Sequence, residues 1–147
     1  MSKSTHHNVP EQRVQRFVQL NTRMWEATLK SEQEFLKQAC NISAAQLQVI
    51  LAVGQSPSCT MGHLAKILHF SQANVTQMAN SLIAKKFLKR QRSKEDRRVV
   101  YLNLLEKGQR ICKLHREHVE RTAREWFAKM PDEDQEMMLQ FWEKYLL

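Results

Sequence analysis

Hydrophobic side chains near the start of the chain recur at intervals of three and four residues. No Gly or Pro interrupts this pattern between residues 11 and 39, and its apolar positions include Val14, Phe17, Val18, Met24, Trp25, Leu29, Phe35 and Leu36. The spacing predicts one amphipathic helix, roughly 40 Å long at 1.5 Å per residue. Because such a helix is long for a small domain, we expect part of its apolar face to contact something outside the compact core.

A second helical pattern begins at a capping box. Ser43 stands before the pattern and Gln46 follows three residues later, an arrangement in which the two side chains satisfy backbone N–H groups at a helix start. The helix is expected over residues 44–53, because Gly54 occupies the position of a helix-ending glycine and Pro57 follows it.

Two further short helices are separated by a three-residue turn. Thr60 can cap a helix over residues 61–68, and Ser71 can cap one that runs from Gln72 to about Lys85. Two short helices joined in this way are typical of a helix–turn–helix unit. Its inner face is expected to contain Leu64, Ala65, Ile67, Val75, Met78, Ala79 and Leu82.

The pattern then changes to a strand-like one. Residues 87–92 and 99–104 are short runs bounded by charged residues, the second rich in β-branched and aromatic positions, and both predict strands. The polar stretch 93–97 separates them as a turn. A hairpin directly after a helix–turn–helix is a wing, so residues 43–104 are predicted to form a winged helix–turn–helix.

The last part of the chain returns to helical spacing. One long helix is expected from about Glu106 to Met130, where Pro131 ends it. Residues 132–135 form a second capping box with Asp132 as the cap. An apolar stripe follows at Met138, Phe141, Trp142 and Tyr145. The predicted fold class is therefore mainly α, about six helices with a small β-hairpin wing.

The charge of the chain is concentrated in the predicted hairpin. The 147 residues carry a formal net charge of +8, and the isoelectric point is about 9.7. Residues 85–98 contain eight basic and two acidic side chains, a net +6, whereas residues 131–147 have a net charge of −4. A focused basic surface beside a helix–turn–helix favours double-stranded DNA as the partner. A solvated charged hairpin is the alternative.

Composition argues against several other classes. No apolar run approaches the roughly 20 residues of a membrane span, and the polar N-terminus has no signal-peptide core. Glycine-rich phosphate loops and hydrolase motifs are absent. We therefore expect a cytoplasmic protein that is not an enzyme and has no cofactor, metal or membrane partner. Its N-terminal segment, with His6 and His7, is expected to be frayed.

The central part of the chain resembles the MarR family of transcription regulators. Residues 61–108 carry the resemblance in motif detail, and the flanking helices match the family's architecture across nearly the whole chain. The matching residues are Leu64-Ala65, Ser71, Val75-Thr76, Leu82, Asp96-Arg97-Arg98, Leu102 and Leu104-Leu105-Glu106-Lys107-Gly108. One departure is Leu105, which stands where the family usually has a helix-capping Thr, and a missing cap costs about 1 kcal/mol.

The resemblance implies a homodimeric, sequence-specific DNA-binding regulator that most often represses transcription. It assigns residues 43–104 to DNA binding and residues 11–40 and 105–147 to dimerisation, within a single domain over 1–147. Each protomer would place its recognition helix in a major groove and its wing in a flanking minor groove of a palindromic operator. Many members also bind a small aromatic or anionic effector between these two regions.

Four residues of the predicted recognition helix are expected to face the base edges: Gln72, Ala73, Asn74 and Gln77. Gln and Asn can form bidentate hydrogen bonds with adenine N6 and N7, and an alanine methyl can contact the thymine methyl. We therefore expect base readout with a preference for A·T pairs. Ordinary exposed polar positions are the alternative.

The remaining predicted contacts are to phosphates and to the minor groove. Ser71 and Thr76 are expected at phosphates near the positive end of the helix. The resemblance assigns Arg98 to the narrow minor groove, with Asp96 holding this arginine and the turn. Four further cations would bind the DNA backbone: Lys89, Arg92, Lys94 and Arg97.

A metal-responsive regulator of the same fold is one alternative. His115 and His118 lie three residues apart on one predicted helix, so both could reach one metal ion. Leu47 and Gln48, however, stand where further ligands would be needed. Packing or solvent-facing histidines are therefore the favoured interpretation.

A redox response and an effector pocket are further alternatives. Cys40, Cys59 and Cys112 form no CxxC pair, and small buried or inert thiols are the favoured interpretation. Of the three, Cys59 is the best placed for reactivity because it precedes a helix start. Trp25, Trp126 and Met130 could line an effector pocket, although core or dimer-interface packing is the favoured interpretation. A winged helix that binds nucleic acid without sequence specificity, or binds protein, is the last alternative. The polar recognition residues favour duplex DNA.

Overall fold

The computed structural model describes residues 9–38, 41–56 and 59–146, with Leu146 described by its backbone alone. The chain divides into two compact units, one that ends at Asn41 and one that begins at Ile42. The segment with His6 and His7, together with Cys40 and Pro57, lies outside the described residues. None of the described helices is long and apolar enough to cross a membrane.

The first unit is a single helix, α1 (Glu11–Gln38), which confirms the predicted long helix. The hydroxyls of Thr22 and Thr28 each donate a hydrogen bond to a carbonyl four residues earlier. Its exposed large apolar side chains are Val14, Phe17, Val18, Leu20, Met24, Trp25 and Leu29. A helix with so much exposed apolar surface is typical of one that packs against another surface.

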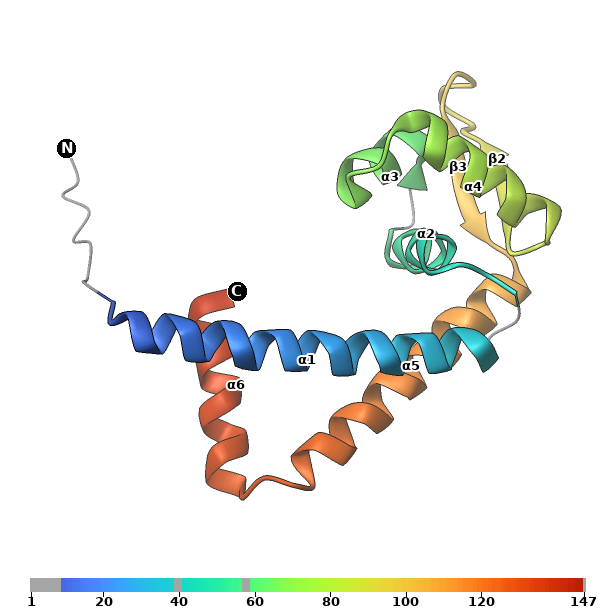
Figure 1. Cartoon of the computed structure of the whole chain (residues 1–147). Coiled ribbons are helices and arrows are strands. Elements are labelled where there is room, and N and C mark those ends of the chain that lie inside the picture. The colour runs from blue at the N-terminus through green and yellow to red at the C-terminus, as the bar shows by residue number, and fades with distance from the viewer. Residues whose placement is uncertain (1–8, 39–40, 57–58, 147) are drawn as a thin grey trace, which may run out of the picture. The chain divides into compact units, whose positions relative to one another are not determined.

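The second unit contains the predicted helix–turn–helix, hairpin and C-terminal helices (Figure 1). In chain order its elements are α2 (Ala44–Gln55), β1 (Cys59–Thr60), α3 (Met61–Leu68), α4 (Gln72–Ala84), β2 (Leu88–Arg92), β3 (Val100–Leu104), α5 (Glu106–Phe127) and α6 (Asp132–Leu146). The strand β1 was not predicted, because a strand of two residues has no periodicity of its own.

The wing belongs to a three-stranded antiparallel sheet with the strand order β1-β3-β2. Along the hairpin, Leu88 pairs with Leu104 and Arg92 pairs with Val100. On the other side of β3, Cys59 pairs with Leu102. Because β1 leads directly into α3, the sheet connects the base of the wing to the first helix of the helix–turn–helix.

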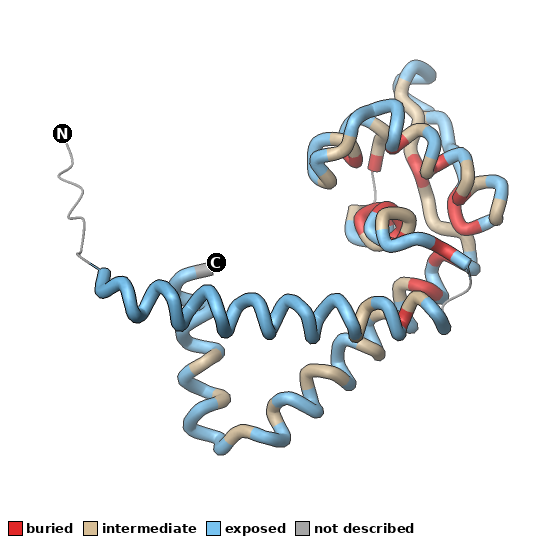
Figure 2. The backbone as a smooth tube through the Cα atoms, viewed as in Figure 1, coloured by how far each residue is buried: buried red, intermediate tan, exposed pale blue. Residues whose placement is uncertain are grey.

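The core of this unit lies among α2, α4 and the sheet, where Figure 2 places most of the buried residues. Its fully or almost fully buried side chains are Leu47, Val49, Ile50, Cys59, Leu64, Val75, Ala79, Leu82, Phe87, Leu88 and Leu102. Of the predicted inner face, Ala65 and Met78 are half-buried. Ile67 is exposed, which corrects that prediction, because the short helix α3 buries only the side that carries Leu64.

The predicted N-caps of α2, α3 and α4 are confirmed. Ser43 and Gln46 form both hydrogen bonds of the capping box. Thr60 Oγ1 accepts a hydrogen bond from the backbone N–H of His63, and Ser71 Oγ accepts one from that of Asn74. Leu105 precedes α5 without a side-chain hydrogen bond to its first turn, as the sequence predicted.

Gly54 does not end α2, which corrects the sequence prediction. The helix continues to Gln55, and no glycine in the described part of the chain has a positive φ. A Cβ atom at Gly54 would lie 3.0 Å from Sγ of Cys112 and 3.2 Å from Cδ1 of Leu104. The glycine therefore permits α2 to approach α5 and β3 closely.

The predicted capping box at the start of α6 is wrong as well. Asp132 is the first residue of the helix, and the backbone N–H of Gln135 donates to the carbonyl of Pro131 at 3.1 Å. The side chain of Gln135 instead donates to the carbonyls of Phe127 and Met130, at 3.2 and 3.0 Å. Gln135 thus donates to carbonyls at and just beyond the C-terminal end of α5, and it joins the two helices.

Candidate nucleic-acid interface

The turn between α3 and α4 is closed by a residue in the left-handed conformation. His69 has φ 53° and ψ 34° and ends α3, where its backbone N–H donates to the carbonyl of Ala65. The N–H of Phe70 donates to the same carbonyl at 3.1 Å. Non-glycine residues rarely adopt this conformation, and histidine is among those that do so more often. The turn sets the direction in which α4 leaves α3.

Helix α4 has one buried and one exposed face. Val75, Ala79 and Leu82 are fully buried against the core. The four residues predicted to read bases, Gln72, Ala73, Asn74 and Gln77, are all exposed. The structure therefore leaves the first turns of α4 accessible to a partner, while the buried face fixes the orientation of the helix.

The two predicted phosphate contacts on α4 differ in their local bonding. Ser71 is exposed, and its hydroxyl oxygen accepts the N–H of Asn74 at 3.2 Å, which leaves the hydroxyl proton available to a phosphate oxygen. Thr76 is half-buried, and its hydroxyl donates to the carbonyl of Gln72 at 2.8 Å. Thr76 would have to rotate away from this carbonyl to donate to a phosphate.

The second half of α4 is held by polar contacts to its neighbours that the sequence did not reveal. Gln46 of α2 donates from Nε2 to Ser81 Oγ at 3.0 Å. Lys107 of α5 donates to the carbonyl of Lys85 at 3.3 Å, and its ammonium lies 4.3 Å from the ring centroid of Phe87. A cation at the end of a helix complements the negative end of the helix dipole.

The turn of the wing is organised by Ser93 and Asp96. Ser93 Oγ accepts the N–H groups of Glu95 and Asp96, at 3.2 and 3.3 Å. Asp96 Oδ1 accepts the backbone N–H of Arg98 at 2.9 Å. The aspartate therefore contacts the main chain of this arginine, and the guanidinium extends from an ordered turn.

The wing presents its cations to solvent. The predicted backbone contacts Lys89, Arg92, Lys94 and Arg97 are exposed, as is Arg98. Arg90, which was not among the predicted contacts, is also exposed and donates to Asn80 of α4 at 2.6 Å. No sequence spacing could indicate this contact, because the two residues belong to elements that meet only in the folded chain.

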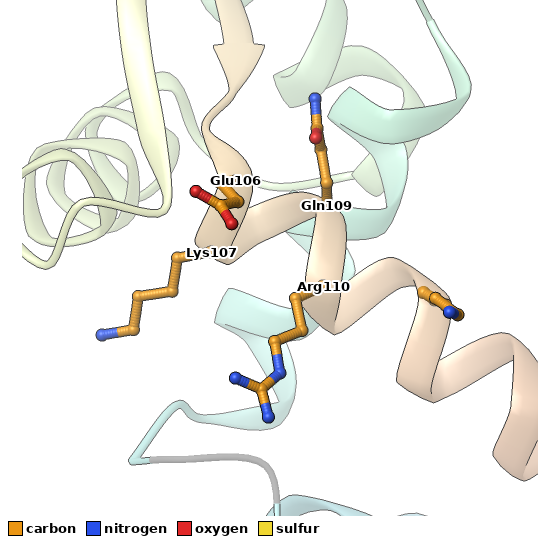
Figure 3. A pocket seen from close by; sticks show the side chains of 5 residues that line it. Glu106, Lys107, Gln109 and Arg110 are labelled. Carbon is orange, nitrogen blue, oxygen red and sulfur yellow. The ribbon is translucent and has the colours of Figure 1, made fainter.

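A shallow cavity of about 510 Å³ lies along the first turns of α5 (Figure 3). Its lining residues are Glu106, Lys107, Gln109, Arg110 and Lys113. Small-molecule sites usually combine apolar walls with a few polar groups, whereas four of these five side chains are charged. The candidate effector residues Trp25, Trp126 and Met130 do not belong to this described lining.

The two described cysteines are poor candidates for redox sensing. Cys59 is fully buried, and desolvation raises the pKa of its thiol, in agreement with the favoured interpretation as a buried, inert thiol. Burial also raises the pKa of Cys112, although the nearby Arg116 partly opposes this. A raised pKa reduces the reactive thiolate fraction. Among the described residues, no group of three or more His, Cys, Asp or Glu side chains could hold a metal ion.

The arrangement of α3, α4 and the β2–β3 hairpin defines a winged helix–turn–helix protein. Residues 41–99 match the model of the MarR family. The proteins that match are transcriptional regulators and not enzymes.

Relatives with related sequences and structures extend this match over most of the chain. The HTH-type transcriptional regulator PchR of Bacillus subtilis (strain 168) is 27% identical over 124 residues, which cover 78% of this chain and 73% of PchR. The crystal structure of Streptococcus pneumoniae FabT in complex with DNA has a TM-score of 0.76 and 27% identity, and the match covers 90% of this chain and 96% of FabT. A MarR family protein from Bacillus stearothermophilus shares the fold, with a TM-score of 0.77 at 20% identity over 92% of this chain and 95% of that protein.

Proposed function

We propose that the chain is a cytoplasmic regulator of the MarR family, a sequence-specific repressor that binds palindromic operators as a homodimer. The observation that carries the proposal is the exposed polar start of α4, which stands beside a hairpin segment with a net charge of +6 over residues 85–98. FabT, whose structure is similar, is bound to DNA in its crystal structure.

In this proposal α4 reads bases in the major groove. Gln72, Asn74 and Gln77 donate to and accept from adenine edges, and Ala73 contacts a thymine methyl. The exposure of all four side chains supports this role. Ser71 contacts a phosphate at the positive end of α4, and Thr76 does so after its hydroxyl turns from the Gln72 carbonyl.

The wing supplies the minor-groove and backbone contacts. Arg98 enters the narrow minor groove, where the negative potential favours a guanidinium. Asp96 supports it by holding the Arg98 main chain in the turn. Four cations bind the DNA backbone: Lys89, Arg92, Lys94 and Arg97. Their exposure supports this assignment.

We infer that the helices outside residues 43–104 build the dimer. The exposed apolar side chains of α6 support this: Met137, Leu139, Phe141, Trp142 and Tyr145. Several large apolar side chains exposed along one helix are typical of a surface that packs against a partner. A two-fold axis would place the two recognition helices about one turn of DNA apart, roughly 34 Å. A bound small aromatic or anionic effector would change that spacing and release the operator.

The test is binding of the full chain to the DNA upstream of its own coding sequence and to a scrambled duplex, across a salt series. We expect the native fragment to bind about 10³-fold more tightly or better, with a footprint of two half-sites. Equal affinity for both duplexes, with a steep loss at high salt, would contradict the proposal. The wing would then be a general polyanion-binding surface.

A further inference from the structure

Arg90 and Asn80 connect the wing to the recognition helix through a short hydrogen bond. The guanidinium of Arg90, on β2, donates from Nη2 to Oδ1 of Asn80, on α4, at 2.6 Å. Both residues are exposed. A short bond between two exposed side chains of different elements holds the arginine in one orientation at the junction of α4 and the hairpin.

Asn80 lies on the outward face of α4. It follows Gln77 by three residues and Ala73 by seven, so the three residues share one side of the helix. The opposite side carries the buried Val75 and Leu82. The contact between Arg90 and Asn80 therefore adjoins the surface that the proposed function directs at DNA.

Arg90 also emerges on the side of the sheet that faces α4. It is paired with Leu102, which is almost fully buried, and side chains of directly paired residues lie on the same face of a sheet. Leu88, two residues earlier, is buried on that same face. Arg90 therefore lies on the same face of β2 as the buried Leu88, but farther along the strand, where it contacts α4.

The geometry of the DNA grooves indicates which part of the DNA the contact between Arg90 and Asn80 faces. A major groove and the adjacent minor groove are separated by one sugar–phosphate strand. If α4 occupies one groove and the wing the other, the residues between them face that strand. We propose that Arg90, oriented by Asn80, is a phosphate contact on the strand that separates the two grooves. This inference rests on the proposed function.

The chemistry of the pair suits this role. A guanidinium has five N–H donors, and the bond to Asn80 leaves donors for a phosphate, which Arg can bind in a bidentate manner. The amide of Asn80 carries no charge, so it orients Arg90 without neutralising it. The charge of Lys113, by contrast, is partly neutralised, because its ammonium lies 3.9 Å from the carboxylate of Glu117. Because Asn80 already holds the Arg90 side chain before DNA binds, less side-chain entropy is lost on binding.

The experiment measures DNA affinity of the full chain against salt concentration for four variants. Arg90→Gln removes the charge, Asn80→Ala removes the orienting amide, and the double variant removes both. Lys129→Gln removes one exposed charge at the turn between α5 and α6 and serves as the control. Thermal unfolding of each variant verifies folding, and each protein is titrated with the native upstream duplex and with a scrambled duplex.

We expect Arg90→Gln to weaken binding to both duplexes by about fivefold to tenfold and to reduce the salt slope by about 0.9. Asn80→Ala should weaken binding about threefold with an unchanged slope, because the charge is retained. The double variant should bind no more weakly than Arg90→Gln, since Asn80 acts through Arg90.

Three results would overturn the inference. They are an Arg90→Gln slope equal to that of Lys129→Gln, losses that multiply in the double variant, and a change of preferred base in Asn80→Ala. The last result would make Asn80 a base-reading residue. A parent protein that does not distinguish the native from the scrambled duplex would contradict the proposed function instead. The slope change of Arg90→Gln is measurable even then.

Discussion

Gly108, in the first turn of α5, lies against the backbone of Phe87, which follows α4 in the chain. It is buried, and a Cβ atom there would lie 2.5 Å from the carbonyl oxygen of Phe87. That carbonyl accepts the N–H of Leu105 at 2.9 Å, so it cannot move without breaking a hydrogen bond at the start of α5. The glycine of the Glu-Lys-Gly motif is thus required by packing.

We expect Gly108→Ala to lower the free energy of unfolding by about 1–3 kcal/mol, because overpacking outweighs the better helix propensity of alanine. Urea denaturation measures the change. Gly62→Ala is the matched control, since Gly62 is exposed in α3 and a Cβ there meets nothing within 4 Å. Gly62→Ala should leave stability unchanged or raise it. Equal destabilisation by both substitutions would contradict the packing argument.

Substitution of Asn74 would distinguish the reading of bases from the general affinity for DNA. Its side chain is exposed, whereas its backbone N–H donates to Ser71 Oγ. Asn74→Ala should therefore preserve the helix cap and remove one base contact worth about 1–3 kcal/mol of discrimination. We expect a loss of affinity for the operator with the affinity for a scrambled duplex retained. If both affinities fall equally, Asn74 does not read a base.

At the scale of elements, Gln46 connects the start of α2 to the middle of α4. Its Oε1 accepts the N–H of Ser43 at 3.2 Å, and its Nε2 donates to Ser81 Oγ at 3.0 Å. We expect Gln46→Ala to destabilise the protein by about 1–2 kcal/mol through loss of both bonds. Gln48→Ala, at an exposed position of the same helix, should have no effect on chemical denaturation. Comparable losses in the two variants would exclude a special role for Gln46.

The sequence predicted the elements whose signals are local. Ser43, Thr60 and Ser71 cap helices through hydrogen bonds to backbone groups three residues later, so a short window of sequence contains the whole signal. Gly54 and Gln135 were misinterpreted, because tertiary neighbours determine their roles. The same reason explains why the strand β1 was missed.

In the candidate interface, the exposed face of α4 was predictable from the sequence, whereas the contacts between elements were not. The outward face of α4 follows from helical periodicity, since Val75, Ala79 and Leu82 occupy the opposite side. The contact between Arg90 and Asn80 depends on how the hairpin packs against α4, which periodicity does not contain. The burial of Cys59 likewise depends on its pairing with β3.

At the scale of the whole molecule, the exposed apolar side chains of α6 favour assembly with a second copy of the chain. Phe141 is 54% and Tyr145 is 63% exposed, and their ring centroids are 5.1 Å apart. We expect the protein to sediment at about twice its 17.4 kDa mass, as a dimer would.

Phe141→Glu should shift the protein toward 17.4 kDa and weaken operator binding, because a buried carboxylate opposes the interface. Gln140→Glu adds the same charge at the adjacent polar position and should remain dimeric. Sedimentation equilibrium measures both. A parent chain that is monomeric at the concentrations where it binds its operator would contradict the homodimer.

The division of α4 into two faces has a consequence for how such regulators diversify. The side chains of Gln72, Ala73, Asn74 and Gln77 contribute little to the core, so replacing them costs little folding stability. Substitutions of Val75, Ala79 or Leu82 would instead create cavities or clashes. If α4 reads bases as proposed, point mutations at its exposed positions redirect the chain to different operators while the scaffold stays intact. Gene duplication followed by changes at these few exposed positions would be enough to separate two regulatory circuits.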